Sequence, residues 1–310
     1  MSARAVVFAY HDVGVRCLSV LLAHGVDIPL VVTHPDDPDE NVWFASVEKL
    51  ARWHDIEVVR PDDPEQLVGR LSRINPDFLF SFYYRRMLSP AVLACASRGA
   101  FNMHGSLLPQ YRGRVPVNWA VLRGERETGA TLHEMVARPD AGRIAGQMAV
   151  PILPDDRAID VFRKVTTAAE IVLDRTLPAL LDSSAPLLVQ DLSKGAYFGG
   201  RKPEDGRIDW SRPAREIHDL VRAVAPPYPG AFTALGDKRL RVLRTRVLNG
   251  AGGPGDATLR VEKGGRLVAS CADGGRLAVL EAEMDALPFT AAHVGTQVLP
   301  LGVVRLAGST

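Results

Sequence analysis

Short apolar runs rich in β-branched residues alternate with segments of helical periodicity along the first half of the chain. The runs predicted as strands are residues 4–10, 27–34, 56–61, 77–84 and 99–104. Between them, apolar residues recur at helical spacing in residues 15–25, 43–56, 64–74 and 89–97. This alternation is typical of parallel strands joined by helical crossovers, so we expect an α/β fold with a doubly wound, mainly parallel sheet.

The pattern changes in the middle of the chain. Two further strands are predicted at 128–136 and 142–152, joined by a Pro-Asp-Gly-type turn, and a long helix follows at 155–182. Residues 183–203 lie in a stretch rich in Gly, Pro and Ser and are predicted to form a linker. We therefore expect a first domain over residues 1–200 that ends in this linker.

The remainder of the chain, residues 204–310, has a different pattern of predicted elements. One helix is predicted at 213–225, and short strand-like runs separated by Gly-rich turns follow it. Short strands at this spacing indicate a small C-terminal β-barrel domain of the OB-like kind.

Composition limits the class of protein. The 310 residues carry a net charge of +1, so no general attraction to nucleic acid or to an anionic membrane is expected. Cys17, Cys95 and Cys271 have neither metal-site spacing nor an even count, which favours a reducing compartment. No apolar run reaches membrane length, and the N-terminal run is too short for a signal peptide. We expect a cytoplasmic protein without membrane insertion.

Asn102 and His104 lie two residues apart in the last predicted parallel strand, directly before the sequence GSLLPQYRGR. Alternate strand residues share a face, so both side chains point to one side at the carboxyl end of a strand, where such sheets bind ligands. An amide donor beside an imidazole suits a reaction through a tetrahedral oxyanion. Asp140, on the predicted turn, is placed to orient the ring and raise its pKa. The alternative is an interior Asn and His that satisfy loop carbonyls.

Other residues support no competing site. No histidine pair has zinc-site spacing, and His133 lies mid-strand beside Glu134, so no metal is expected. Ser106 is not in a G-x-S-x-G elbow, and we expect it to cap its loop. The turn after the first strand lacks G-x-G-x-x-G, which argues against a dinucleotide site although the fold is related.

The sequence FNMHGSLLPQYRGRVPVNWA, followed by GATLHEMVARPDAGRI, resembles the folate-dependent formyltransferases. The resemblance extends over the whole chain, through AVVFAYHDVG, FSFYYRRML, IDW and VRAVAPPYPGAF. Within the family, the chain is most similar to the formyltransferase domain of the bifunctional enzymes that make UDP-4-amino-4-deoxy-L-arabinose for lipid A, a modification tied to polymyxin resistance. Those enzymes carry a second, dehydrogenase-decarboxylase half. We expect a free-standing version, with room for a separate decarboxylase partner, or a part of the longer chain.

The resemblance implies 10-formyltetrahydrofolate as formyl donor and assigns Asn102, His104 and Asp140 as catalytic residues. It also implies a set of folate contacts: Arg86, Met87, Leu88, Arg114, Val136, Ala137, Arg138, Pro139 and Asp140. Departures from the family pattern are small, namely Gln110 in the PQYRG stretch and Pro139. A degenerate member that only binds its ligands has no need of the catalytic residues, so we expect an enzyme.

Charge discriminates between the acceptors that the family uses. Phosphate contacts dominate nucleic-acid affinity, and methionyl-tRNA formyltransferases have a basic loop after the second strand. Here that loop is acidic and holds Asp36, Asp37, Asp39 and Glu40. Residues 201–246 hold eleven Lys and Arg against six Asp and Glu, which we expect to be ordinary solvated surface. We therefore expect a nucleotide sugar as substrate and no nucleic-acid partner. The alternatives are a methionyl-tRNA formyltransferase and an N-formyltransferase for another nucleotide amino sugar.

Overall fold

The computed structural model describes residues 2–38, 41–236, 238–250, 252–253, 255–294 and 303–306. Its internal contacts divide the chain into two compact units. The first comprises residues 1–116, 127–151 and 162–199, and the second comprises 117–126, 152–161 and 200–310. The boundary expected near residue 200 between separately folding domains stays a prediction. Asp39 and Glu40 of the acidic loop lie outside the described residues.

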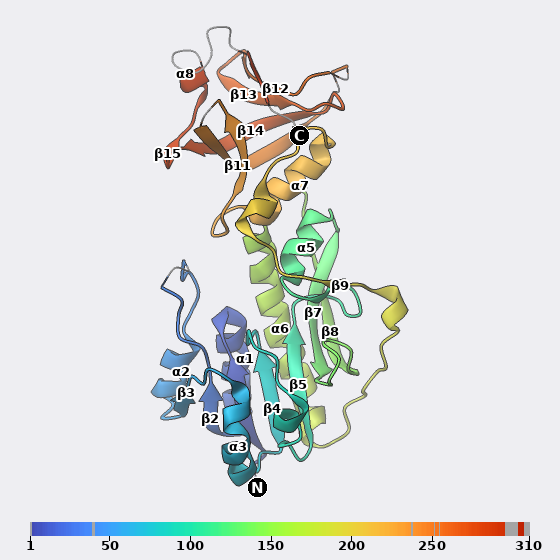
Figure 1. Cartoon of the computed structure of the whole chain (residues 1–310). Helices are drawn as coiled ribbons and strands as arrows, with labels where there is room; N and C mark the ends of the chain where they lie inside the picture. Colours follow the sequence, from blue (N-terminus) through green and yellow to red (C-terminus); the bar gives the residue numbers. More distant parts are fainter. Residues whose placement is uncertain are drawn as a thin grey trace. The chain divides into compact units, whose positions relative to one another are not determined.

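A seven-stranded sheet forms the centre of the first unit, in the order β3-β2-β1-β4-β5-β7-β8 (Figure 1). The strands are β1 (Arg4–Ala9), β2 (Asp27–Val32), β3 (Glu57–Val59), β4 (Phe78–Phe82), β5 (Gly99–His104), β7 (Glu127–Glu134) and β8 (Ile144–Pro151). The first five are mutually parallel, and β7 is antiparallel to both of its neighbours, β5 and β8. The strand order reverses between β1 and β4, which makes this the switch point where such sheets bind ligands.

Helices cover both faces of this sheet. They are α1 (His11–Ala23), α2 (Val47–Trp53), α3 (Val68–Ile74) after the 3₁₀ turn Pro64–Leu67, α4 (Pro90–Leu93) and α6 (Ala158–Leu181). On one face, Val6 and Phe8 of β1 pack in a single buried cluster with Leu71 of α3 and Val92 of α4. Alternate strand residues point to the other face, where the Arg16–Glu170 ion pair joins α1 to α6. The sheet is therefore doubly wound.

The second unit is an antiparallel β structure with one main helix. Its helices are α5 (Pro116–Leu122), α7 (Ala214–Val224) and α8 (Ala291–Val294). Its strands are β10 (Ala231–Leu235), β11 (Lys238–Leu248), β12 (Thr258–Glu262), β13 (Arg266–Ser270), β14 (Arg276–Met284), β15 (Leu287–Pro288) and β16 (Val303–Arg305), in the order β10-β11-β14-β13-β12-β16 with β15 on β14. The predicted fold class, a mainly parallel α/β sheet with a smaller β domain after it, is confirmed. No helix among the described residues is long and apolar enough to cross a membrane.

One local prediction was wrong. The helix expected from residue 15 begins at His11, because Gly14 is a close-packing position and not a turn: a Cβ there would lie 2.9 Å from Val47 and 3.2 Å from the Cβ of Ala9. Within the expected linker, which stays a prediction, β9 (Tyr197–Phe198) forms a parallel pair with β6 (Arg112–Gly113).

Candidate active site

Asn102 and His104 lie on β5, and the neighbouring strand β7 completes their surroundings. In the antiparallel register, Asn102 is opposite His133 and His104 is opposite Thr131. All four side chains thus gather at the carboxyl end of β5, next to the switch point. The sequence placed His133 on its strand but did not reveal that the strand pairs with β5.

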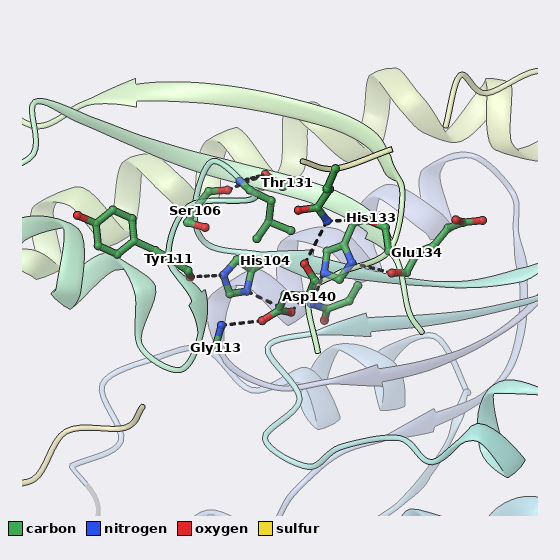
Figure 2. A network of polar contacts seen from close by, with 12 residues as sticks. His104, Ser106, Tyr111, Gly113, Thr131, His133, Glu134 and Asp140 are labelled. Carbon is green, nitrogen blue, oxygen red and sulfur yellow. Dashed lines mark hydrogen bonds and ion pairs between the residues drawn. The ribbon is translucent and has the colours of Figure 1, made fainter. Parts of the chain in front are cut away.

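Asp140 reaches this cluster from the turn between β7 and β8. Its backbone adopts a positive φ of 51°, a conformation that Asp and Asn tolerate better than most residues. One carboxylate oxygen, Oδ2, accepts a 2.8 Å hydrogen bond from the backbone N–H of Gly113. The other, Oδ1, lies 3.6 Å from Nδ1 of His104 and 3.4 Å from Nε2 of His133 (Figure 2). The carboxylate therefore faces both imidazoles at once.

The ring of His104 is held in one tautomer. Nε2 donates a 2.8 Å hydrogen bond to the backbone carbonyl of Tyr111 (Figure 2). The residue is only 6% exposed. In the neutral ring the proton therefore resides on Nε2, and the lone pair of Nδ1 faces Asp140. Nδ1 is the atom at which this imidazole takes up or releases a proton.

The protonation balance of the pair differs from the expectation. Burial lowers the pKa of His104 below its usual value, and this outweighs the opposing effect of Asp140, which raises the pKa as expected. Burial works to raise the pKa of Asp140, but His104, His133 and the Gly113 N–H together hold it well below its usual range. The ground state is therefore a neutral imidazole beside an ionised carboxylate.

His133 is a further member of the cluster, which its position in the sequence did not reveal. Its Nδ1 donates a 2.7 Å hydrogen bond to the carbonyl of Glu134, so Nε2 of the neutral ring is an acceptor. Nδ2 of Asn102 donates to this Nε2 over 3.2 Å. One amide hydrogen of Asn102 is thus used to fix its orientation, and the second, which has no acceptor among the described residues, remains for a ligand.

The loop after His104 is fixed by a buried hydroxyl. Thr131, fully buried, donates to the carbonyl of Ser106 over 2.6 Å and accepts from the N–H of Leu108 over 3.2 Å. Ser106 in turn donates to the carbonyl of Gln110, which matches its expected role in closing the loop. These bonds fix the path of the chain that presents the Tyr111 carbonyl to His104.

The segment around residues 188–198 braces the same loop from outside. The N–H groups of Arg112 and Arg114 donate to the carbonyls of Ala196 and Phe198. Gly113, with a φ of 103°, lies so close to this segment that a Cβ would meet the carbonyl oxygen of Phe198 at 2.2 Å. The amide that holds Asp140 is therefore positioned by a stretch that composition alone indicated to be a linker.

The residues expected to contact folate occupy three segments. Arg86, Met87 and Leu88 follow β4, Arg114 follows the loop of Gly113, and Val136, Ala137, Arg138 and Pro139 form the turn that ends at Asp140. Met87 is 64% exposed and Val136 42%, whereas the side chain of Leu88 is buried in the core cluster. Arg86 donates from its guanidinium to the carbonyl of Pro61. The three segments follow β4, β5 and β7, and their contact with folate stays a prediction.

Family comparison identifies the class of protein. The profile described as formyl transferase matches residues 19–177, and the profile of the formyl transferase C-terminal domain matches residues 201–292. The chain belongs to the formyl transferase family. It is therefore a formyltransferase with both domains of the family, and the buried cluster of His104 and Asp140 lies in the first of them.

Solved structures share this fold. An N-formyltransferase from Helicobacter canadensis, in complex with folinic acid and dTDP-3-aminofucose, has a TM-score of 0.71 at 20% identity, over 90% of this chain and 99% of that one. WlaRD, a sugar 3N-formyltransferase solved with dTDP and 5-N-formyl-THF, gives 0.71 at 20%, over 92% and 98%. HypX from Aquifex aeolicus with tetrahydrofolic acid gives 0.63 at 17%, over 95% and 47%. At these identities the likeness shows the fold alone.

Proposed function

We propose that this formyltransferase moves the formyl group of 10-formyltetrahydrofolate to the 4-amine of a nucleotide sugar, with UDP-4-amino-4-deoxy-L-arabinose, the lipid A precursor, as the preferred acceptor. The observation that carries the proposal is the buried cluster of Asn102, His104, His133 and Asp140 at the end of β5. It combines one free amide donor with one imidazole whose Nδ1 exchanges protons. Two proteins of the same fold support the substrate class, namely the N-formyltransferase in complex with folinic acid and dTDP-3-aminofucose and the sugar 3N-formyltransferase WlaRD with dTDP and 5-N-formyl-THF.

The reaction needs an oxyanion donor and a proton carrier. The neutral amine of the sugar attacks the formyl carbon of the donor, forming a C–N bond and a tetrahedral intermediate with negative oxygen. The free amide hydrogen of Asn102 stabilises this oxygen. Nδ1 of His104 accepts the proton of the incoming amine, and Asp140 stabilises the imidazolium. The proton then passes to N10 of the folate as its bond to the formyl carbon breaks.

The surroundings of the cluster suit a flat aromatic donor with an acidic tail. Met87 and Val136 expose apolar side chains on the segments that follow β4 and β7. Arg114 is exposed at the end of the loop that holds His104, and its guanidinium suits a carboxylate. We assign Arg86, Met87, Leu88, Arg114 and residues 136–140 to the folate, with Leu88 acting through its backbone because its side chain is buried.

Charge placement favours a nucleotide sugar over a tRNA. Asp36 of the acidic loop accepts a 2.9 Å hydrogen bond from Tyr10, which holds one negative charge at the carboxyl end of β1. In the second unit, three of the five basic side chains of β11 are paired with acids from outside the basic stretch. The pairs are Lys238–Asp285, Arg241–Glu283 and Arg244–Glu281. Much of the excess of Lys and Arg in residues 201–246 is thus neutralised by neighbouring acids. These side chains are therefore expected to attract a phosphate backbone only weakly.

The decisive experiment supplies 10-formyltetrahydrofolate with each acceptor separately and follows the release of tetrahydrofolate. We expect turnover with UDP-4-amino-4-deoxy-L-arabinose whose rate changes little between 50 and 200 mM salt. A tRNA reader that makes several phosphate contacts would instead lose on the order of 10³-fold in affinity over that range. Efficient, salt-sensitive turnover with methionyl initiator tRNA and none with an amino sugar would overturn the proposal.

A further inference from the structure

His11 occupies the switch point of the sheet, directly after β1. It is the first residue of α1 and has a positive φ of 67°. Its Nδ1 accepts a 2.9 Å hydrogen bond from the backbone N–H of Asp12. The neutral ring therefore carries its proton on Nε2, and the local backbone fixes this tautomer.

The ring is enclosed by aromatic side chains. Phe44 stacks on it with ring centroids 3.9 Å apart, and Trp43 and Phe162 meet it edge-on at 4.6 and 4.8 Å. Burial, aided by the positive charge of Arg85, lowers the pKa of His11 to about 3. The side chain is 12% exposed, and none of the described residues accepts a hydrogen bond from Nε2. His11 thus presents a fixed, uncharged N–H donor at the edge of a packed ring.

Tyr83 connects His11 to the catalytic cluster. β1, β4 and β5 are adjacent, and Ala9, Phe82 and Met103 are in register across them. The residues that follow these strand ends therefore lie side by side, roughly 5 Å apart from strand to strand. Tyr83 lies 6.3 Å from His11 between ring centroids, and its hydroxyl would be 2.3 Å from a Cβ on Gly105. His11 and His104 thus belong to strand ends that only β4 separates, and Tyr83 of that middle strand end lies near His11 and next to Gly105.

The first turn of α1 favours a neutral group over a phosphate. Helix N-termini in related sheets bind phosphates through free N–H groups. Here the Asp12 N–H is taken by His11, and the Asp12 carboxylate accepts from the N–H of Ala45 over 2.7 Å. A phosphate at this turn would meet that carboxylate, whereas a sugar hydroxyl would not be repelled.

We infer that His11 is a specificity-determining residue for the acceptor, in which Nε2–H donates a hydrogen bond to a hydroxyl of the amino-sugar ring while the amine lies at His104. The inference rests on the proposed function. It assigns the acceptor sugar to the aromatic wall at the end of β1 and places the diphosphate away from the first turn of α1.

The test compares the parent acceptor with its 2-deoxy and 3-deoxy analogues, each of which lacks one hydroxyl. The wild-type enzyme should lose roughly three- to tenfold in kcat/KM with one analogue, the size expected for one neutral hydrogen bond. His11→Phe keeps an aromatic ring and removes the donor. It should lower kcat/KM for the parent by a similar factor and no longer distinguish the parent from that analogue. In His11→Asn the backbone can keep its positive φ, but the shorter side chain cannot place a donor at the position of Nε2. This variant should therefore also lose the discrimination.

Controls separate a lost hydrogen bond from a disturbed fold. His24→Phe, at the other end of α1, should leave all three kcat/KM values unchanged. Binding of 5-formyltetrahydrofolate, followed by calorimetry, should be the same in wild type and both His11 variants. An equal loss for the parent and both analogues, or no loss, would overturn the inference. Absence of wild-type turnover with every nucleotide amino sugar would instead overturn the proposed function, and this inference with it.

Discussion

Nδ1 of His104 lies 3.6 Å from Oδ1 of Asp140, with both side chains largely buried. This separation exceeds hydrogen-bond length, so each partner is held in place by the hydrogen bond that it makes elsewhere. The Tyr111 carbonyl fixes one residue and the Gly113 amide fixes the other. Nδ1 can therefore take a proton without first giving up a hydrogen bond, and the carboxylate then stabilises the imidazolium.

We expect Asp140→Asn to lower kcat on the order of 10²- to 10³-fold while leaving the fold intact. Asn tolerates the positive φ and can still accept from Gly113, so the loop keeps its shape. Because burial already lowers the pKa of His104, the acid limb of the kcat/KM profile should lie below pH 6.5 in the wild type. Asp140 raises that pKa, so its neutral replacement should move the limb to lower pH. Profiles from pH 5 to 9 measure both.

Alanine at the catalytic positions gives the complementary result. Asn102→Ala, His104→Ala and Asp140→Ala should each abolish measurable formyl transfer with circular dichroism spectra like the wild type. Near-normal turnover by His104→Ala at saturating folate would remove this imidazole from the mechanism.

His133 should act through Asn102, and two amide variants separate its two hydrogen bonds. The Oε1 atom of Gln reaches the position of Nε2, so His133→Gln can still accept from Asn102. The side chain of Asn reaches only to Nδ1, so His133→Asn can keep the bond to Glu134 but leaves Asn102 unheld. We expect kcat to fall several-fold further in His133→Asn, with little change in KM for the folate. Equal kcat values in two equally stable variants would show that His133 is only structural.

Much of the fold could be predicted because its signals are local. Buried parallel strands are continuous apolar runs, and in each crossover helix the apolar residues recur at helical spacing. The order of strands and helices could therefore be predicted from the sequence. The site was visible only in part. The partnership of His133 with Asn102 depends on a strand pairing across 31 positions. The Tyr111 carbonyl and the Gly113 amide are backbone groups, so the residue types at these positions do not predict their hydrogen bonds to the site. The net pKa shift of His104 depends on burial, which only packing determines.

Arg114 provides a test of the folate assignment. Its side chain is exposed, while its backbone N–H is held by Phe198, so Arg114→Ala should remove the cation without moving the loop. We expect KM for 10-formyltetrahydrofolate to rise more than KM for the sugar, as initial rates with each substrate varied would show. Arg175→Ala, also exposed but on α6, should change neither constant. The reverse order would place Arg114 at the diphosphate of the acceptor.

Gly105 follows His104 and leaves room for Tyr83. A Cβ on Gly105 would lie 2.3 Å from the Tyr83 hydroxyl and 3.5 Å from Cγ of Pro116, so Gly105→Ala must displace an aromatic ring. Such overpacking costs roughly 1–3 kcal/mol of unfolding free energy. Because the displaced ring adjoins Gly105, the residue next to His104, we also expect kcat to fall more than roughly tenfold, a larger loss than destabilisation alone explains in an enzyme that stays folded.

Gly69 is the matched control, since it lies in α3 and a Cβ added there would have no atom within 4 Å outside its own stretch of helix. Gly69→Ala should raise the free energy of unfolding by roughly 0.5–1 kcal/mol through helix propensity and leave kcat unchanged. Denaturant unfolding and steady-state rates on both variants separate stability from geometry. If Gly105→Ala kept full kcat, Tyr83 would have moved without disturbing His104, and the packing of the strand ends would not matter for the chemistry.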